Sequence, residues 1–386
     1  MKKFPKGFLF GSATAAFQIE GGDNFSDWSD WEKNKKHIID QSNAKISANS
    51  WHKYKKDIDL LKKTKQNAYR LSLSWAKIEP KEGYFDKSAI EYYKKLLLEL
   101  KKTKIKTMVT LFHFVLPKWA AAQNGFLNKK IIINFVGFCE QMVEELDDLV
   151  DQWVTINEPQ TYVLFGYLQG KWPPGKKNLF SAFKVLKNLN RAHILSYKKM
   201  RKITSTPVGI VENIALFKPL FNNFWDKLFT FIINYLATVS LIGPISKFTD
   251  FLGINYYFEV HLQHKKPLFK FLTKLKSDAG WSIYQKGLYN VIMENLIWRK
   301  PIYITENGIA DEHDRYRPKF IKDAFRYIYK AIGHGADIRG YFHWTLMDNF
   351  EWAEGYTQKF GLFTIDRKPR QSAEIYRALI EKYSAD

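Results

Sequence analysis

Cysteine, arginine and acidic residues are scarce in this sequence. Its 386 residues include one cysteine, Cys139, so the chain can form neither an internal disulfide nor a cysteine-based zinc or iron–sulfur site. Only 11 of the 60 basic residues are arginine, whose planar fork suits specific phosphate and base recognition. We therefore interpret the net charge of +21 as a solvated, lysine-rich surface and expect no nucleic-acid partner. Weak attraction to an anionic surface or membrane is the alternative that this charge leaves open.

No linker or clear targeting segment is visible either. Internal repeats, low-complexity tracts and Pro/Gly/Ser-rich stretches do not divide the chain, which favours one domain spanning residues 1–386. An apolar run at residues 8–15 superficially resembles a signal peptide, but it is short and Pro5 interrupts its approach. Together with the single cysteine, this predicts a cytoplasmic protein.

One long apolar stretch, residues 228–242, is too short to cross a bilayer as a straight helix and contains Asn234. It predicts a buried or amphipathic helix. Aromatic residues gather at its start and leave open an interfacial or partner-facing patch. They are Phe221, Phe224, Trp225 and Phe229.

Aromatic residues are abundant throughout, at 16% of the chain, with 30 Phe, 21 Tyr and 12 Trp. Hydrophobic residues reach 46% and charged residues 26%, as in ordinary soluble globular proteins. The aromatic content indicates either extensive aromatic packing or a surface that stacks on flat ligands, of which sugars are one kind.

Short strand-like apolar runs alternate with longer segments of helical periodicity along the whole chain. Amphipathic helices are expected at residues 89–102, 131–146, 181–201 and 318–332. The strand-like runs are residues 8–13, 67–72, 107–112, 153–156, 208–211, 251–254, 302–305 and 341–344. Eight such β–α units predict an α/β protein, a single (β/α)8 TIM barrel with its active site at the C-terminal ends of the strands.

Polar residues follow directly on these apolar runs. In a barrel all the C-terminal strand ends face one mouth, so these side chains should converge although they are scattered along the sequence. They are Gln18, Glu20, His113, Asn157, Glu158, Glu212, Asn213, Asn255, Tyr256, Tyr257, Glu306 and Asn307; Arg70 lies within the second run, and Trp344 ends the eighth.

Two glutamates at strand ends suggest a chemistry. Glu158 lies in TINEP, residues 155–159, and Glu306 lies in ITENG, residues 304–308. Hydrolysis of an acetal needs a proton donor for the leaving oxygen and a second carboxylate at the oxocarbenium-like centre, and two such glutamates can supply both. The alternative is that each glutamate only caps the helix after its strand.

Several long motifs, in order, resemble those of family 1 glycoside hydrolases, the β-glucosidase and β-galactosidase family. FGSATAAFQIEG at residues 10–21 resembles the opening signature and YRLSLSW at 69–75 the second. The TINEP and ITENG segments resemble the acid/base and nucleophile motifs, and WTLMDNFEW at 344–352 resembles the sugar-binding segment. The resemblance covers nearly the whole chain and implies a retaining exo-β-glycosidase that acts by double displacement on a small β-glycoside or oligosaccharide.

The resemblance also implies roles for the catalytic group. Glu158 would be the general acid/base and Glu306 the nucleophile that forms a covalent glycosyl-enzyme. Arg70 and Tyr257 would hold Glu306 ionised, while the negative charge of Glu306 would raise the pKa of Glu158. Asn157 would bind the sugar 2-hydroxyl.

Matching positions imply a substrate-binding set as well. Trp344 would form the floor under the sugar, Trp281 would flank the leaving-group side, and Asn255 would support Tyr257. Sugar contacts are implied for Gln18, His113, Glu351 and Trp352, with Phe360 at the edge of the same set.

Members that act on 6-phosphorylated sugars place Ser, Lys and Tyr where this chain has Glu351, Gln358 and Phe360. A carboxylate at position 351 would repel a phosphate, so an unphosphorylated glycoside is expected, most simply a β-D-glucoside with β-galactoside or β-fucoside overlap. No cofactor and no metal are implied.

The chain departs from the family pattern in places. Phe114 stands where many members have Trp, and Lys359 replaces an Arg that could brace the loop before Phe360. The stretches 213–250 and 263–279 are shorter than in most members, so the leaving-group side and the oligomeric state are the least transferable properties.

Two other motifs are weak. Residues 170–177 imitate a P-loop, but Lys177 replaces the Ser/Thr and two prolines remove backbone amides. Asp311-Glu312-His313-Asp314 has metal-binding residue types, yet it is most simply a solvated loop.

Two alternatives to hydrolysis are considered. In a transglycosylase a sugar hydroxyl rather than water captures the glycosyl-enzyme. An inert sugar-binding relative is disfavoured because both glutamates are present.

Overall fold

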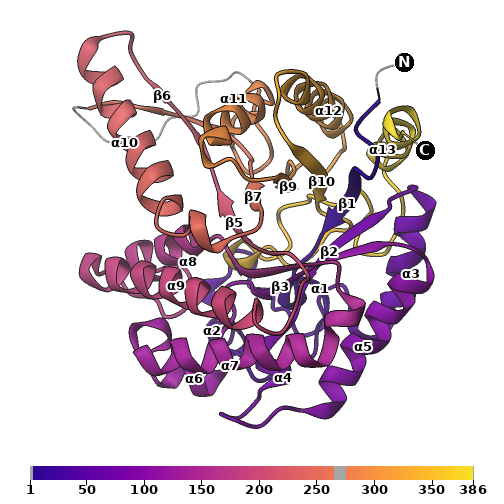
Figure 1. Cartoon of the computed structure of the whole chain (residues 1–386), viewed down its shortest axis with the longest axis vertical. Coiled ribbons are helices and arrows are strands. Elements are labelled where there is room, and N and C mark those ends of the chain that lie inside the picture. Colours follow the sequence, from indigo (N-terminus) through magenta and orange to yellow (C-terminus); the bar gives the residue numbers. More distant parts are fainter. Residues whose placement is uncertain (1–2, 265–274, 386) are drawn as a thin grey trace.

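Eight parallel strands close into a barrel in the computed structural model of the chain, which describes residues 3–264 and 275–385 (Figure 1). This confirms the predicted (β/α)8 barrel. The order around the barrel is β1-β10-β9-β7-β5-β4-β3-β2. The barrel strands are β1 Leu9–Ala13, β2 Ala68–Ser72, β3 Lys106–Phe112, β4 Gln152–Asn157, β5 Val208–Asn213, β7 Leu252–Asn255, β9 Ile302–Asn307 and β10 Ile338–Trp344.

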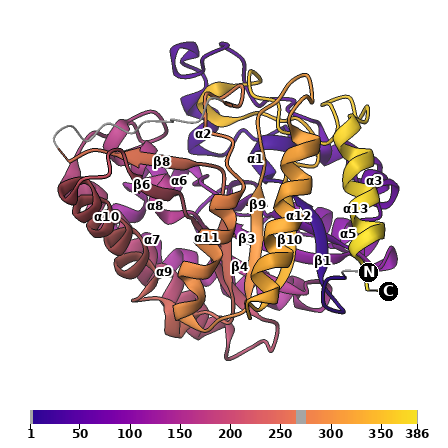
Figure 2. The same cartoon turned by 90° about the horizontal axis from the view of Figure 1, so that it is seen from above.

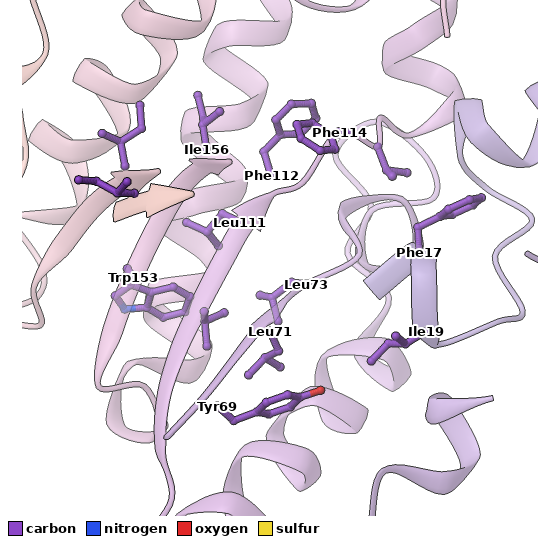
Figure 3. Packing of buried hydrophobic residues seen from close by; sticks show 14 of the residues in the cluster. Phe17, Ile19, Tyr69, Leu71, Leu73, Leu111, Phe112, Phe114, Trp153 and Ile156 are labelled. Atoms are coloured by element: carbon purple, nitrogen blue, oxygen red, sulfur yellow. The ribbon is translucent and has the colours of Figure 1, made fainter. Parts of the chain in front are cut away.

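Alternation along each strand separates two buried apolar clusters. Met108, Val154 and Val211 belong to a small cluster with Ala13, Ala68 and Phe342, which fills the barrel interior. Their strand neighbours pack in the larger cluster between strands and helices, where Tyr69, Leu71, Leu111, Trp153 and Ile156 are seen side by side (Figure 3). A barrel strand is therefore apolar on both faces and reads as a continuous run in the sequence.

Helices surround the barrel (Figures 1 and 2). The four predicted helices are all present as α5, α7, α9 and α12, with ends within two residues of the expected ones. The α-helices are α1 Ala16–Ile19, α2 Asp27–Trp31, α3 Ser50–Lys63, α4 Trp75–Ile78, α5 Lys87–Lys102, α6 Lys118–Ala122, α7 Lys129–Leu146, α8 Pro159–Val163, α9 Leu179–Met200, α10 Phe224–Ile242, α11 Lys286–Asn295, α12 Arg317–Gly333 and α13 Gln371–Tyr383. A π-helical segment, Leu164–Gln169, continues α8, and short 3-10 turns lie at Lys35–His37, Gly125–Leu127, Asp147–Leu149, Ser246–Phe248, Leu296–Trp298 and Trp352–Glu354.

The run at residues 8–15, which resembles a signal peptide, is part of the barrel. Residues Leu9–Ala13 form β1, which pairs with β10 on one side and β2 on the other. Cys139 is buried in α7, as a small core residue.

Two short strands were not predicted. β6, Leu216–Pro219, and β8, Glu259–Leu262, form a two-stranded parallel sheet outside the barrel. Each has only four residues, and β6 ends in a proline, so neither stands out from the sequence. β6 follows β5 and β8 follows β7 in the sequence, and both short strands contact α10 (Figure 1).

The apolar stretch 228–242 forms most of α10, so the predicted helix is confirmed and begins four residues earlier, at Phe224. Within the described part of the chain, no helix is long and apolar enough to cross a membrane. Of the shortened stretch 263–279, residues 265–274 lie outside the described residues.

Candidate active site

A cavity of about 340 Å³ opens at the C-terminal ends of the barrel strands. Nine of the side chains expected at the site line it: His113, Glu158, Tyr257, Trp281, Glu306, Trp344, Glu351, Trp352 and Phe360. The other four lie buried beneath the lining and contact it or each other: Gln18, Arg70, Asn157 and Asn255.

Glu306 lies near the end of β9 with both carboxylate oxygens engaged. Nη1 of Arg70 lies 2.5 Å from Oε1, and the hydroxyl of Tyr257 donates a 2.6 Å hydrogen bond to Oε2. Arg70 comes from β2 and is 1% exposed, so its charge is available only inside the site. A fixed cation and a fixed hydroxyl thus orient one carboxylate.

Glu158 follows the end of β4 and is bound by amides rather than by a cation. The side chain of Asn255 donates to Oε1 at 2.6 Å and that of Asn213 donates to Oε2 at 3.1 Å. The backbone of Glu158 is left-handed, with φ of 43°, and Pro159 then begins α8. This turn ends the strand and presents the carboxyl to the cavity; non-glycine residues in this region concentrate at functional sites.

A hydrogen-bonded belt joins the surroundings of the two glutamates. Thr305, next to Glu306, donates to Oδ1 of Asn255, whose Nδ2 faces Glu158. Arg70 also donates through Nη2 to Oδ1 of Asn157 at 2.6 Å. Since four strands contribute to this belt, the barrel itself fixes the relative position of the carboxyl groups.

The belt also fixes the protonation of His113. Arginine can only donate, so the Asn157 atom facing Arg70 must be the oxygen, and its Nδ2 must donate to Nε2 of His113, 3.3 Å away. Burial holds the pKa of His113 well below its ordinary value, so the ring is neutral with its proton on Nδ1. Nδ1 is buried and has no partner among the described residues, while other atoms of His113 line the cavity.

The two glutamates have different electrostatic surroundings. Burial, together with the charge of Glu306, raises the pKa of Glu158 to about 7. Burial also raises the pKa of Glu306, but the positive charge of Arg70 and the hydrogen bond from Tyr257 oppose this rise. The contacts of Glu306 with Arg70 and Tyr257 that the resemblance implies are both present. The resemblance did not include burial, which raises the pKa of Glu306. Glu306 is therefore the better carrier of the negative charge, and Glu158 the better carrier of a proton.

Gln18 and Glu351 form a second polar group on the cavity wall. Nε2 of Gln18 lies 3.2 Å from Oε2 of Glu351 and 2.9 Å from the carbonyl oxygen of Phe350. Burial, together with the charge of Glu306, raises the pKa of Glu351 to about 8. This pair can exchange hydrogen bonds with several hydroxyl groups of one ligand.

Aromatic rings make up much of the remaining wall. The ring of Trp344 stacks on that of His113 with centroids 6.2 Å apart, while Trp281 lies 5.7 Å from Tyr257 and 6.0 Å from Phe360. Trp352 packs on Trp172, which also lines the cavity, and on the fully buried Trp28. The result is a rigid cavity in which flat apolar faces alternate with hydrogen-bonding groups, as suits a sugar ring.

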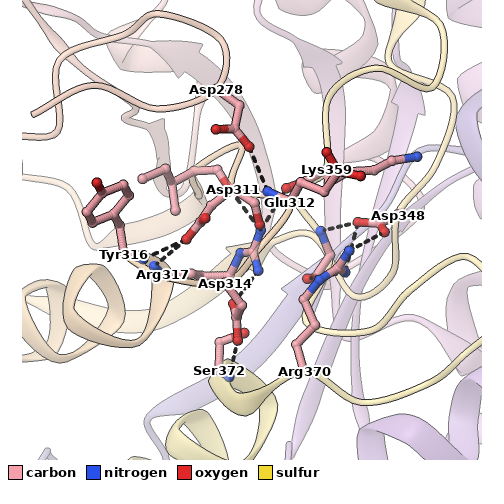
Figure 4. Close-up of polar contacts among 12 residues, drawn as sticks. Asp278, Asp311, Glu312, Asp314, Tyr316, Arg317, Asp348, Lys359, Arg370 and Ser372 are labelled. Carbon is pink, nitrogen blue, oxygen red and sulfur yellow. Dashed lines mark hydrogen bonds and ion pairs between the residues drawn. The ribbon is translucent and has the colours of Figure 1, made fainter.

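The loop that carries Phe360 is anchored by Arg317 (Figure 4). This buried guanidinium donates to the carbonyl oxygens of Lys359, at 2.7 Å, and of Asp311, at 2.6 Å, and it pairs with Asp314. On the adjacent segment, Arg370 pairs with Asp348 at 2.7 Å. The bracing guanidinium that Lys359 cannot provide is thus supplied from α12.

The same network accounts for the acidic stretch at residues 311–314. Asp311 accepts from the backbone N–H groups of Tyr316 and Arg317, and Asp314 pairs with Arg317 and accepts from the backbone of Ser372. Across residues 3–264 and 275–385, no three His, Cys, Asp or Glu side chains form a group that could hold a metal ion.

Several cavity residues were not singled out from the sequence. Asn213 was noted only as a strand-end residue, although it binds Glu158. Trp172 and Lys171, in the stretch that imitates a P-loop, line the cavity instead. Phe114, noted above as standing where many members have Trp, also lines the cavity, together with Leu164, Phe165, Phe258 and Ala279. The signal for Asn213 was its position after a strand, whereas Leu164 and Phe165 lie in the π-helical segment and the remaining residues in loops whose path the sequence does not indicate.

Comparisons with known proteins agree with this geometry. The family model for glycosyl hydrolase family 1 matches residues 1–234 and 238–384. The chain is 30% identical to a 1,4-β-D-glucan glucohydrolase of Thermotoga neapolitana over 95% of this chain and 98% of that protein. Among solved structures, a β-glycosidase from Pyrococcus horikoshii superposes with a TM-score of 0.91 at 34% identity, over 100% of this chain and 98% of the other. A β-glucosidase from Thermotoga maritima in complex with glucoimidazole gives 0.94 at 28% identity, over 100% of both chains.

Proposed function

Because the chain belongs to glycosyl hydrolase family 1 and is a β-glucosidase-like glycosidase, we propose that it removes unphosphorylated β-D-glucosyl residues from the non-reducing end, with retention of configuration. The observation that carries the proposal is that two carboxyl groups at one cavity have different binding partners. Glu306 is held by a cation and a hydroxyl, whereas Glu158 is held by two amides.

In the first step Glu306 is the nucleophile. One of its oxygens attacks the anomeric carbon while the bond to the glycosidic oxygen breaks, and Glu158 gives its proton to that oxygen. The aglycone leaves as a neutral alcohol, and the sugar is left as an ester of Glu306. With a pKa of about 7, a large fraction of Glu158 is protonated near neutral pH, as this step requires.

In the second step Glu158 acts as a base. Esterification removes the negative charge of Glu306, which is one of the causes that raise the pKa of Glu158. Glu158 then takes a proton from water as the water oxygen attacks the anomeric carbon and the bond to Glu306 breaks. Both carboxyl groups return to their starting states.

The cavity supports an unphosphorylated sugar. Glu351 and His113 line the cavity, Gln18 donates to Glu351, and Trp344 provides a flat face. With a pKa of about 8, the carboxyl of Glu351 is mostly protonated near neutral pH and supplies no positive charge for a phosphate, and its ionised form at higher pH repels a dianion. A galactoside differs at one hydroxyl and is the second expected substrate.

The leaving-group side supports an apolar aglycone, aryl or alkyl. Leu164, Phe165, Trp172, Phe258 and Trp281 line the cavity, beside the polar Thr161, Lys171, Asp278, Glu354 and Gln358. Burial of an aryl or alkyl group against the apolar side chains is favourable. A higher kcat/KM for phenyl β-D-glucoside than for cellobiose is expected; the reverse order would contradict this assignment.

The test compares the parent protein with Glu306→Ala and Glu158→Ala on 4-nitrophenyl β-D-glucoside. Each variant should lose at least about 1,000-fold in kcat. Azide should restore turnover in both but give opposite anomers, the α-glucosyl azide with Glu306→Ala and the β-glucosyl azide with Glu158→Ala. The exposed Glu374→Ala is the matched control and should keep full activity.

Two outcomes would overturn the proposal. The same azide anomer from both variants would exclude the two assigned roles, and a folded parent with no activity on gluco- or galactosides would favour a sugar-binding relative. Product analysis at high acceptor concentration then separates hydrolysis from transglycosylation, since only the latter transfers glucose to the acceptor rather than to water.

A further inference from the structure

Helix α10 carries polar residues where it contacts the rest of the protein. Asp226 and Thr230 are buried, and Asn234 donates from Nδ2 to the carbonyl oxygen of Phe217 in β6. The carboxylate of Asp226 is bound by both the backbone N–H and the ring of His264. These residues recur at four-residue intervals, which places them on one face of the helix.

The opposite face of α10 is apolar and exposed. Trp225 is 61% exposed and Phe231 is 67% exposed. The spacing of the exposed residues is that of one continuous helical surface, which we call the α10 outer face. It consists of Phe224, Trp225, Leu228, Phe231, Ile232, Tyr235 and Leu236. An ordinary surface helix has the reverse arrangement, so this helix is suited to an apolar medium on its outer side.

The position of α10 leaves this face accessible. In both views the helix lies at the outer edge of the molecule, beside β6 and away from the barrel axis (Figures 1 and 2). Its length and composition do not allow it to cross a bilayer, as is true of every helix in the described ranges. Trp and Tyr side chains have an apolar ring and a polar group, which suits the headgroup level of a membrane.

The charge near α10 is positive. Its buried acid, Asp226, is bound by His264, and Glu259 of the neighbouring β8 is paired with Lys218. Lys227 lies in α10 and Lys247 in the short turn after it, and the whole chain carries +21. A second copy of the chain would bring the same charge to this face, whereas an anionic lipid surface is complementary to it.

We propose that α10 is a membrane-interface helix, which lies in the plane of an anionic lipid surface with the α10 outer face at the headgroup boundary. The exposed aromatic side chains supply apolar burial, and the surrounding lysines supply attraction to lipid phosphates. The enzyme then works at the surface of a membrane rather than free in solution. This inference does not depend on the substrate proposed above.

The experiment measures co-sedimentation of the full chain with vesicles of phosphatidylcholine alone and of phosphatidylcholine with phosphatidylglycerol. The parent should bind the anionic vesicles more tightly, and less so as salt rises towards about 0.15 M. Trp225→Ser combined with Phe231→Ser should lower the partition coefficient about tenfold or more.

The matched control is Ile46→Ser combined with Ile133→Ser, which removes two similarly exposed apolar side chains, 68% and 62%, that do not belong to α10. It should bind like the parent, and both double variants should keep parental activity on a soluble glucoside. No binding by the parent at low salt would overturn the proposal, as would equal binding by the two double variants. Light scattering without vesicles tests whether a second copy of the chain covers the α10 outer face instead. A parent dimer that becomes a monomer in Trp225→Ser/Phe231→Ser would assign the face to that second copy.

Discussion

Nη1 of Arg70 lies 2.5 Å from Oε1 of Glu306, although 236 positions of sequence separate the two residues. Both side chains are almost completely buried, so neither charge has water as an alternative partner. Loss of one partner of such a pair leaves an uncompensated buried charge, which typically costs about 3–5 kcal/mol. The pair therefore holds the nucleophile and stabilises the barrel mouth together.

Arg70→Met should raise the pKa of Glu306, because the cation that opposes the effect of burial is gone. We expect kcat to fall at least about 100-fold and the acidic limb of the kcat/KM profile to move to higher pH. The pH profile of the variant checks this. Arg339→Met is the control, since Arg339 is half exposed and forms an ion pair with Asp337. An unchanged acidic limb with reduced stability would mean that Arg70 is structural only.

Tyr257→Phe removes the hydroxyl that donates to Oε2 of Glu306 without creating a cavity. The loss of one donor should reduce kcat about 10- to 100-fold, with little change in melting temperature. Steady-state kinetics and a thermal melt on the same preparation test it. A lower melting temperature with unchanged kcat would contradict the assignment.

Glu158 has a pKa of about 7, raised by burial and by the charge of Glu306. Because the first step needs its protonated form, kcat/KM should fall as pH rises above about 7. Asn213→Ala removes a hydrogen bond that lowers this pKa, so the basic limb should move to higher pH. A basic limb that moves to lower pH, or stays, would refute the role of Asn213.

Glu212, at the end of β5, is 2% exposed and has no ion pair among the described residues. Burial, together with the charge of Glu158, raises its pKa from 4.5 to about 8. Below pH 4.5 the carboxyl of Glu212 is protonated in both the folded and the unfolded chain. Between pH 4.5 and pH 8 it is protonated only in the folded chain. This residue therefore makes the free energy of unfolding decrease as pH rises from about 4.5 to about 8. Above pH 8 the buried carboxylate is ionised, and the free energy of unfolding stays lowered by the same amount.

Glu212→Gln should remove this pH dependence and stabilise the protein at pH 9 by on the order of 3 kcal/mol. Denaturant unfolding of parent and variant at pH 5 and pH 9 measures the difference. The exposed Glu374→Gln serves as the reference substitution. Equal effects at both pH values would show that Glu212 is not protonated in the folded chain.

The barrel and its eight strands could be predicted from the sequence because each strand is a short apolar run on which polar residues follow directly. Glu158 and Glu306 stand at such ends, and so does Asn213. The local pattern of apolar and polar residues does not predict which side chains make contacts between residues remote in sequence. Arg317 bracing the carbonyl oxygen of Lys359 is an example, since nothing near position 359 indicates an arginine 42 residues away.

The two strands outside the barrel and the α10 outer face show a second limit. β6 and β8 are four residues long, which is below what alternation can distinguish from a loop. The sequence predicted that residues 228–242 are helical, but apolarity alone does not tell which side is covered. The cytoplasmic location stays a prediction.

The belt of amides beneath the cavity runs in one direction only, from Arg70 through Asn157 to His113. Arginine keeps its protons in proteins, the pKa of Tyr257 is held well above its ordinary value by burial, and that of His113 well below. This side of the site can therefore orient groups but cannot relay protons from the solvent behind it. Glu158 therefore donates its own proton in the first step and is not part of a chain of proton transfers through the belt. A solvent isotope effect on that step would report the transfer of a single proton.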